Sequence, residues 1–237
     1  MRIDVVTLFP EFFEWPFSNS LLKRAQEKGR AEFHLHNPRD FTSDRHRTVD
    51  EKPFGGGAGM VLKPEPVFRS VESIPGKSYV ILLSPRGIPL MQAAAGRLAR
   101  KKHLILICGH YEGVDERVSA RLVDEEISLG DFVTMGGEAP ALCLIESVVR
   151  LLPGALGNPD SLKEESFGGT ENGLEKRLEF PQYTRPQVFR GLEVPGVLVS
   201  GNHREIQAWR EKESIRATRQ RRPDLLKKST QKRGKKS

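Results

Sequence analysis

Two uninterrupted apolar runs, "YVILL" at residues 79–83 and "HLILIC" at residues 103–108, constrain the fold of this chain most strongly. A strand with one face in water alternates apolar and polar residues, whereas a strand covered on both faces is apolar throughout. We therefore predict that both runs are central strands of a parallel sheet with helices packed on its two faces.

Shorter apolar segments extend this into an alternation of strands and helices, which is typical of an α/β layered domain. With the two runs above, the expected strands are Ile3–Phe9, Glu32–His36, Tyr79–Leu83, His103–Cys108 and Phe132–Met135. The expected helices are Glu11–Lys28, Glu65–Ser73, Leu90–Lys102, Asp115–Leu122 and Ala139–Leu152. After Leu152 the chain becomes rich in Gly, Pro and acidic residues, which predicts a linker, and past Pro186 it becomes helical and basic.

Composition excludes the membrane, secreted and fibrous classes. The 237 residues are 37% hydrophobic and 29% charged, and none of the apolar runs approaches the roughly 18 residues of a membrane helix. The first residues carry Asp4 and predict a strand, not a signal peptide. Cys108 and Cys143 each lie in an apolar run, so we expect two buried thiols and a reducing, cytoplasmic location.

The formal charge of +7 is unevenly distributed. Residues 1–200 hold 25 Lys and Arg against 27 Asp and Glu, a net of −2, while residues 201–237 hold 13 against 4, a net of +9. The basic residues of Gly201–Leu226 follow a helical pattern, which favours contact with a polyanion such as nucleic acid. For Lys227–Ser237, a solubilising tail is an equally good explanation.

Three Gly- or Pro-containing loops follow predicted strands: "LLSPRG" (82–87), "CGHYEG" (108–113) and "MGGE" (135–138). Ligands of open α/β sheets bind outside the carboxyl ends of strands, where glycines allow the backbone to approach a ligand closely. The loops therefore predict one shared pocket, with ordinary turn chemistry as the alternative.

Standard nucleotide and metal motifs are absent from the sequence. "GGGAGM" (55–60) follows no apolar strand and lacks the Lys-Ser/Thr of a P-loop, and no G-x-G-x-x-G follows the first strand. The six histidines are scattered, so we predict no metal site. The charged, Gly-rich stretch 39–60 is either a solvated loop or a functional lid.

With these residues in view, the chain resembles the bacterial tRNA (guanine(37)-N1)-methyltransferases, S-adenosylmethionine-dependent enzymes of the knotted SPOUT class. The resemblance spans roughly Met1 to Leu226. It rests on the ordered motifs "LFPEFF" (8–13), "PRDFTSDRHRTVDEKPFGGGAGM" (38–60), "LSPRG" (83–87), "CGHYEGVDERV" (108–118), "SLGDFVTMGGE" (128–138), "SVVRLLPGALG" (147–157), "YTRP" (183–186), "SGNH" (200–203) and "RRPDLL" (221–226).

The resemblance implies a SPOUT-type, mostly parallel sheet with helices on both faces and a C-terminal trefoil knot, followed by a small all-helical domain. The implied domains are a cofactor-binding domain at 1–159, a flexible linker at 160–182 and a tRNA-binding domain with a basic tail at 183–237. It also implies a homodimer whose active site lies at the subunit interface.

The family pattern assigns residues to three roles. The S-adenosylmethionine site would comprise Leu83, Ser84, Pro85, Gly109, Tyr111, Glu112, Leu129, Thr134, Gly136, Gly137 and Pro140. Candidates for contact with the tRNA anticodon stem-loop are Arg39, Arg45, His46, Arg47, Tyr183, Arg185, Asn202 and His203. The catalytic pair would be Glu165 and Arg150. Methyl transfer itself demands no metal, and the sequence leaves room for a divalent ion without indicating one.

The chemistry explains why such a pair is needed. Guanine N1 carries a proton at neutral pH, so methylation needs a general base at N1 and a positive group where charge develops on O6. Glu165 departs from the Asp of the family pattern, and Glu164 and Asp160 are the alternative bases. All three acids could instead keep a linker soluble, and Arg150 could instead pair with Glu146 one helical turn earlier.

Two other functions remain open from the sequence. A related SPOUT methyltransferase acting on another RNA would share the cofactor loops but not the stretches at 39–50 and 183–203. A non-catalytic RNA-binding protein would retain the pocket only as a relic, which the intact Gly and Pro residues of all three loops disfavour.

Overall fold

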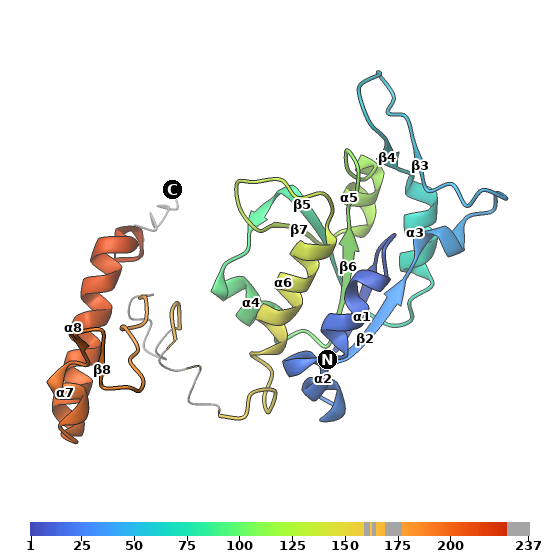
Figure 1. The fold of residues 1–237 in the computed structure, drawn as a ribbon. Coiled ribbons are helices and arrows are strands. Elements are labelled where there is room, and N and C mark those ends of the chain that lie inside the picture. Colours follow the sequence, from blue (N-terminus) through green and yellow to red (C-terminus); the bar gives the residue numbers. More distant parts are fainter. Residues whose placement is uncertain (159–161, 163–164, 169–176, 227–237) are drawn as a thin grey trace, which may run out of the picture. The chain divides into compact units, whose positions relative to one another are not determined.

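The computed structural model describes residues 1–158, 162, 165–168 and 177–226 of the chain. The chain divides into two compact units, Met1–Gly157 and Asn158–Ser237 (Figure 1). Among the described residues, no helix combines the length and the apolar character needed to cross a membrane.

The first unit is built on a five-stranded sheet with the order β2-β1-β6-β5-β7, in which every neighbouring pair is parallel. Its strands are β1 (Arg2–Val6), β2 (Glu32–His36), β5 (Tyr79–Pro89), β6 (His103–Cys108) and β7 (Glu125–Ser128). All residues of β6, the central strand, are buried, as expected for a strand covered on both faces. The predicted α/β class and the mostly parallel sheet are confirmed.

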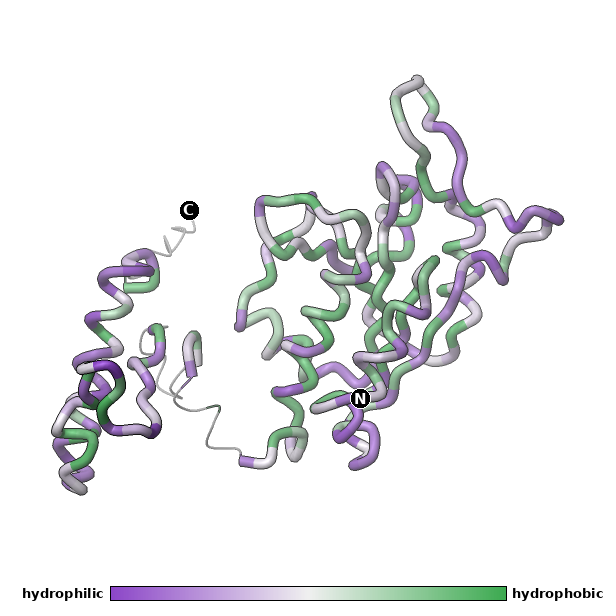
Figure 2. Tube along the Cα trace, viewed as in Figure 1, coloured by the Kyte–Doolittle hydropathy of each residue, from purple (hydrophilic) through white to green (hydrophobic). Residues whose placement is uncertain are grey.

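Helices cover both faces of this sheet (Figure 1). One face packs against α1 (Glu11–Phe17), α2 (Ser20–Glu27), α4 (Gln92–Leu98) and α6 (Glu138–Val149). The other packs against α3 (Pro64–Glu72) and α5 (Glu116–Leu122). Alternate residues of β6 divide between the two cores, with Leu104 and Leu106 on the α6 side and Ile105 and Ile107 on the α3 side. Figure 2 shows the apolar residues concentrated along these central strands.

Two predicted elements differ from the structure. The helix expected over Glu11–Lys28 is two helices, because the side chains of Ser18 and Asn19 donate to the Trp15 carbonyl oxygen at 3.0 and 2.8 Å and end the first one. The strand expected at Phe132–Met135 is wrong: this segment is an exposed loop, and the fifth strand is β7.

The sequence of β7, "EEIS", lacks the apolar pattern of a strand. It forms one nonetheless, because its two carboxylates have partners. Glu125 accepts from Arg97 at 2.7 Å, and Glu126 pairs with Arg86 at 3.4 Å and with Ser119. Charged residues at an edge strand are tolerated when they are paired in this way.

A buried carboxylate links three strands of the sheet. Asp4 on β1 is fully buried and accepts from Arg2 (2.7 Å), His36 (2.6 Å) and His103 (2.7 Å). Burial alone would raise the pKa of Asp4, but the hydrogen bonds from Arg2 and the two histidines outweigh it and hold the pKa well below its usual range.

A long excursion joins β2 to α3. It holds the 3₁₀ helix η1 (Pro38–Phe41) and the antiparallel strands β3 (Asp50–Glu51) and β4 (Val61–Leu62), which frame the Gly-rich segment 53–60. Of the two cysteines, Cys108 is buried as expected, whereas Cys143 on α6 is exposed, which corrects the prediction of two buried thiols.

The second unit is dominated by α8 (His203–Arg221), which is mostly hydrophilic (Figure 2). Around it lie β8 (Val188–Phe189), β9 (Leu192–Glu193), α7 (Gly196–Val199) and the 3₁₀ helix η3 (Pro223–Leu226). The antiparallel β8–β9 pair differs from the expectation of an all-helical domain. Residues 177–182, within the expected linker, belong to this unit: the Leu178 amide donates to Thr218 Oγ1 at 3.0 Å.

Candidate functional site

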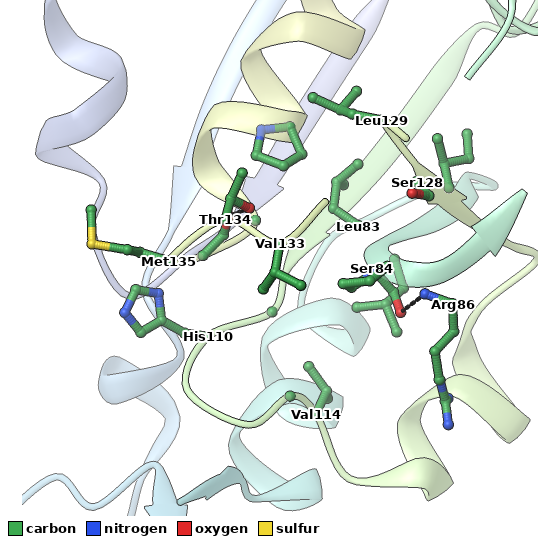
Figure 3. A pocket seen from close by; sticks show the side chains of 18 of the residues that line it. Leu83, Ser84, Arg86, His110, Val114, Ser128, Leu129, Val133, Thr134 and Met135 are labelled. Carbon is green, nitrogen blue, oxygen red and sulfur yellow. Dashed lines mark hydrogen bonds between the residues drawn. The ribbon is translucent and has the colours of Figure 1, made fainter. Parts of the chain in front are cut away.

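A cavity of about 360 Å³ lies at the carboxyl ends of β5, β6 and β7 (Figure 3). We call it the strand-end cavity; its walls are residues 82–86, 109–114, 127–129 and 132–137 together with Pro140. The structure therefore brings the three predicted loops together at one place. The cavity is lined by all eleven residues expected at the cofactor site: Leu83, Ser84, Pro85, Gly109, Tyr111, Glu112, Leu129, Thr134, Gly136, Gly137 and Pro140.

The first wall is an outward bulge of β5. Leu83 and Ile88 both pair with Ile127 of β7, so the four residues between them leave the ladder and turn toward the cavity. The bulge is closed by the Arg86 amide, which donates to Ser84 Oγ at 3.2 Å (Figure 3). A Cβ on Gly87 would lie 2.5 Å from the backbone of Glu126, so this crossing requires glycine.

The Arg86 side chain holds this wall to its neighbours. Its guanidinium donates to Glu116 on α5 at 2.8 Å and to Glu126 on β7 at 3.4 Å. The hydrogen bond with Glu116 and the charge of Glu126 raise the pKa of Arg86.

The second and third walls are in direct backbone contact. The Gly137 amide donates to the Gly109 carbonyl oxygen at 2.7 Å, and His110 and Gly136 form an isolated antiparallel bridge. A Cβ on Gly137 would lie 2.7 Å from Cys108 Cα and 2.8 Å from the Gly109 nitrogen. Two segments of chain therefore pass each other at a distance that only glycine permits, and this contact sets the floor of the cavity.

The loop after β6 is also tied to the Gly-rich excursion. The Glu112 amide donates to the Met60 carbonyl at 3.0 Å, and the Leu62 amide donates to the Gly113 carbonyl at 2.9 Å. Tyr111, at the turn of this loop, has a left-handed φ of 59° and a half-exposed ring at the cavity. The excursion 39–60 is thus anchored at its end to the cavity wall.

A buried polar group behind the cavity was missed by the sequence reasoning. Glu138, the first residue of α6, is buried and accepts from Thr7 Oγ1 at 2.8 Å, while its second oxygen lies 3.6 Å from His110 Nδ1. Burial, and secondarily the charge of Glu138, raise the pKa of the Cys108 thiol. Glu138 lies in the motif "MGGE", and this location was the only sequence signal for it.

Of the two predicted catalytic residues, Arg150 lies in the same unit as this cavity but does not line it. Arg150 is the C-cap of α6, and since α6 begins at the cavity and has 12 residues, Arg150 lies about 18 Å along the helix axis from the cavity floor. Glu165 lies in a turn of the second unit, where the Gly168 amide donates to its carbonyl oxygen at 3.1 Å. The alternative bases Glu164 and Asp160 lie outside the described residues.

The four tRNA candidates of the first unit share the excursion after β2. Arg45, His46 and Arg47 are exposed, while Arg39 is half-buried. Arg47 has a left-handed φ of 53°, pairs with Asp40 and donates to the Arg39 carbonyl at 3.2 Å. The loop therefore has an internal structure that presents several cations on one short segment.

The four candidates of the second unit are divided between two kinds of position. Tyr183 and His203 line a second cavity beside α8. Asn202 caps α8, since its side chain accepts from the Glu205 amide at 3.4 Å. Arg185, two residues after Tyr183, is exposed. In the part of the chain that the structure describes, no group of three or more His, Cys, Asp or Glu could hold a metal ion.

Comparisons with known proteins agree on one family. Residues 1–228 match the family described as tRNA (Guanine-1)-methyltransferase TrmD. A tRNA (guanine-N(1)-)-methyltransferase of Gloeobacter violaceus is 58% identical over 229 residues, covering 95% of this chain and 98% of that protein. Its counterparts from Dictyoglomus turgidum and Brevibacillus brevis are 55% and 56% identical, covering 97% and 96% of this chain and 91% and 92% of those proteins. The chain therefore belongs to the TrmD family of tRNA (guanine-N(1)-)-methyltransferases.

Proposed function

We propose that this protein transfers a methyl group from S-adenosylmethionine to N1 of the guanosine immediately 3′ of the anticodon, position 37, in tRNA. Membership of the TrmD family supports the reaction. The observation that carries the proposal for the site is that eleven residues from three separate segments, 83–85, 109–112 and 129–140, line a single cavity at the strand ends.

The strand-end cavity fits S-adenosylmethionine in size and in the chemistry of its walls. Its Gly-rich loops bring backbone N–H and C=O groups close to the space, which suits an adenine ring, and Leu83, Leu129 and Pro140 supply apolar surface. The bound cofactor would supply an electrophilic methyl group on a sulfonium sulfur. The glycine-only approach of Gly137 to Gly109 would keep the two walls at a fixed spacing around it. We propose that this crossing is part of the trefoil knot.

The chain's own residues would make guanine N1 nucleophilic. We propose that the Glu165 carboxylate accepts the N1 proton and that the Arg150 guanidinium stabilises the charge on O6. A Glu extends one methylene beyond the family Asp, about 1.5 Å, and a misplacement of about 1 Å can cost on the order of a hundredfold in rate. The turn that bears Glu165 must therefore lie further from the base by that amount.

The position of Arg150 supports a homodimer with shared active sites. An arginine side chain cannot span the length of α6, so the Arg150 that serves one strand-end cavity would come from a second copy of the chain. The first unit also exposes large apolar side chains that a second copy could cover: Phe12, Trp15, Ile88, Met91, Phe132, Val133 and Met135.

Mixed dimers test this arrangement. Arg150→Ala removes the guanidinium, and Thr134→Trp fills the strand-end cavity from an exposed position. Neither variant should be active alone. If the site is shared, mixing and refolding them restores part of the activity, because one site then combines an intact cavity with an intact Arg150. If no activity returns, Arg150 and the cavity belong to the same subunit.

We propose the following division of the chain: residues 1–159 hold the cofactor, 160–182 link the domains, and the helical domain 183–237 binds tRNA. The net charge of +9 over residues 201–237 supports contact with a polyanion there. The reaction requires tRNA, and the two free cysteines suit a reducing compartment, so we place the protein in the cytoplasm.

The reaction is tested by transfer of labelled methyl from S-adenosylmethionine to an unmodified tRNA transcript with guanosine at positions 36 and 37. We expect incorporation that is lost when the guanosine at position 37 is replaced by adenosine. Ribosomal RNA fragments should not compete. Incorporation that survives the replacement, or preferred methylation of the ribosomal fragments, would show that the substrate is another RNA.

A further inference from the structure

A second cavity, of about 380 Å³, lies entirely within the second unit between α8, α7 and residues 180–183. We call it the helical-domain cavity. Its apolar walls are Phe180, Tyr183, Leu198 and Ile206. The methyl transfer proposed for the strand-end cavity does not involve this second cavity.

The aromatic walls are held in place before any ligand arrives. Phe180 and Tyr183 both lie against Trp209, with ring centroids 6.5 and 6.2 Å apart. Two residues before Phe180, the carbonyl of Leu178 accepts from Ser214 Oγ at 2.6 Å. Rings fixed in this way lose little conformational freedom when something stacks on them.

The polar groups of the cavity suit the edge of a nucleobase. Gln182, His203 and Gln207 are exposed at its margin and offer amide and imidazole donors and acceptors. The Arg210 guanidinium also lines the cavity and lies 4.8 Å from the centroid of the Phe180 ring. Amides beside aromatic faces, with an arginine over one ring, are the combination that proteins use for unpaired bases.

Charge complementarity points to the same occupant. The helix α8 carries six Arg or Lys residues against three Glu, so the surroundings of the cavity attract a polyanion. A second protein chain would be drawn by apolar surface, but the margin of this cavity is polar.

We propose that the helical-domain cavity binds an unpaired base of the RNA substrate, distinct from the base that is methylated. This inference rests on the proposed function for the identity of the RNA. The base stacks on Tyr183 or Phe180, and its edge bonds to Gln207 or its neighbours at the margin. The cavity would thus hold the anticodon loop by a nucleotide that undergoes no chemistry.

The test is the affinity of the full-length protein for a fluorescein-labelled anticodon stem-loop, measured by anisotropy without methyl donor. Tyr183→Ala removes a stacking surface, and Gln207→Trp fills the cavity from an exposed position. Each should weaken binding about 5- to 150-fold, the range for loss of one stacked base. Tyr183→Phe keeps the ring and should bind more tightly than Tyr183→Ala. Gln220→Trp, exposed on the same helix but not lining the cavity, is the matched control and should bind like wild type.

Salt dependence separates stacking from charge. The slope of log affinity against log salt should stay the same in Tyr183→Ala, because no phosphate contact is lost. Equal affinity in wild type, Tyr183→Ala and Gln207→Trp would overturn the proposal. So would a Gln207→Trp variant that loses self-association in sedimentation while keeping its RNA affinity, because the occupant would then be protein.

The two hypotheses can fail separately. If wild type methylates the tRNA but the variants bind it equally well, the helical-domain cavity has no role in binding and the proposed function stands. If wild type transfers no methyl group but its RNA affinity depends on Tyr183 and Gln207, the base site stands and the proposed function falls.

Discussion

Gly137→Ala should loosen the strand-end cavity through a single methyl group. The φ of Gly137 is −79°, which any residue adopts, so the substitution introduces no backbone strain of its own. The added Cβ would instead lie 2.7 Å from Cys108 Cα and 2.8 Å from the Gly109 nitrogen, both of them backbone atoms that cannot rotate away. One of the two chain segments must move by roughly 1 Å to reach ordinary contact.

The magnitude follows from that displacement. Overpacking of this kind costs about 1–3 kcal/mol in the free energy of unfolding. Opening the Gly137–Gly109 contact also changes the spacing of two cavity walls, and we expect the affinity for S-adenosylmethionine to fall on the order of tenfold to a hundredfold. Calorimetric titration with S-adenosylmethionine and thermal unfolding measure the two effects.

Gly96→Ala is the matched control. Gly96 lies inside α4, and a Cβ there would meet nothing within 4 Å. Alanine in a helix interior should stabilise the protein by about 0.5–1 kcal/mol relative to glycine, with unchanged cofactor affinity. If Gly137→Ala behaves like Gly96→Ala in both measurements, the close crossing does not organise the cavity.

Three further predictions follow from other parts of the chain. Asp4→Asn should lower the free energy of unfolding by about 3–5 kcal/mol at pH 7, because it leaves Arg2 and two histidines without their carboxylate. Because the pKa of Asp4 is lower in the folded protein than in the unfolded chain, its stabilisation is complete above the unfolded-state pKa and is lost as the pH falls below about 4. In urea titrations, the difference in unfolding free energy between wild type and Asp4→Asn should therefore shrink in acid. Arg150→Ala and Glu165→Ala should abolish methyl transfer while calorimetry shows nearly unchanged cofactor binding; an active Glu165→Ala would place the base elsewhere. Deleting Lys227–Ser237 should weaken tRNA binding and flatten its salt dependence together, and an unchanged slope would make the tail a solubility element.

The sheet could be predicted where burial dictates the residue type. The central strands β5 and β6 are covered on both faces, so their apolar runs predicted them directly. The edge strand β7 could not be found in this way, because Glu125 and Glu126 are satisfied by arginines distant in the sequence. Periodicity records burial by apolar neighbours and contains no information about paired charges.

Apolar character misled the prediction at Phe132–Met135 for a related reason. Val133 and Met135 are 82% and 93% exposed, although their sequence suggests a strand. Exposed apolar residues of this kind are expected at a surface that binds something, and the sequence alone does not distinguish that from a core.

The site could be predicted in outline but not in its supporting shell. Two of the loops were found because glycine and proline follow the buried runs of β5 and β6, and "MGGE" was found although the strand expected before it is wrong. The resemblance to a family then assigned the residues of all three. The contact of Thr7 with Glu138 joins residues 131 positions apart, and no local pattern encodes it. The distance of Arg150 from the strand-end cavity, by contrast, could have been derived from the sequence, because the helix expected over Ala139–Leu152 begins directly after "MGGE" and contains Arg150 near its end.

The position of the transferred methyl group tests the proposed reaction most directly. Wild-type protein would be incubated with S-adenosylmethionine and an unmodified tRNA transcript, and the product digested with nuclease and sequenced by mass spectrometry. The predicted result is a single 1-methylguanosine at position 37. A methyl group on another nucleotide, or on another atom of that guanosine, would contradict the proposed function.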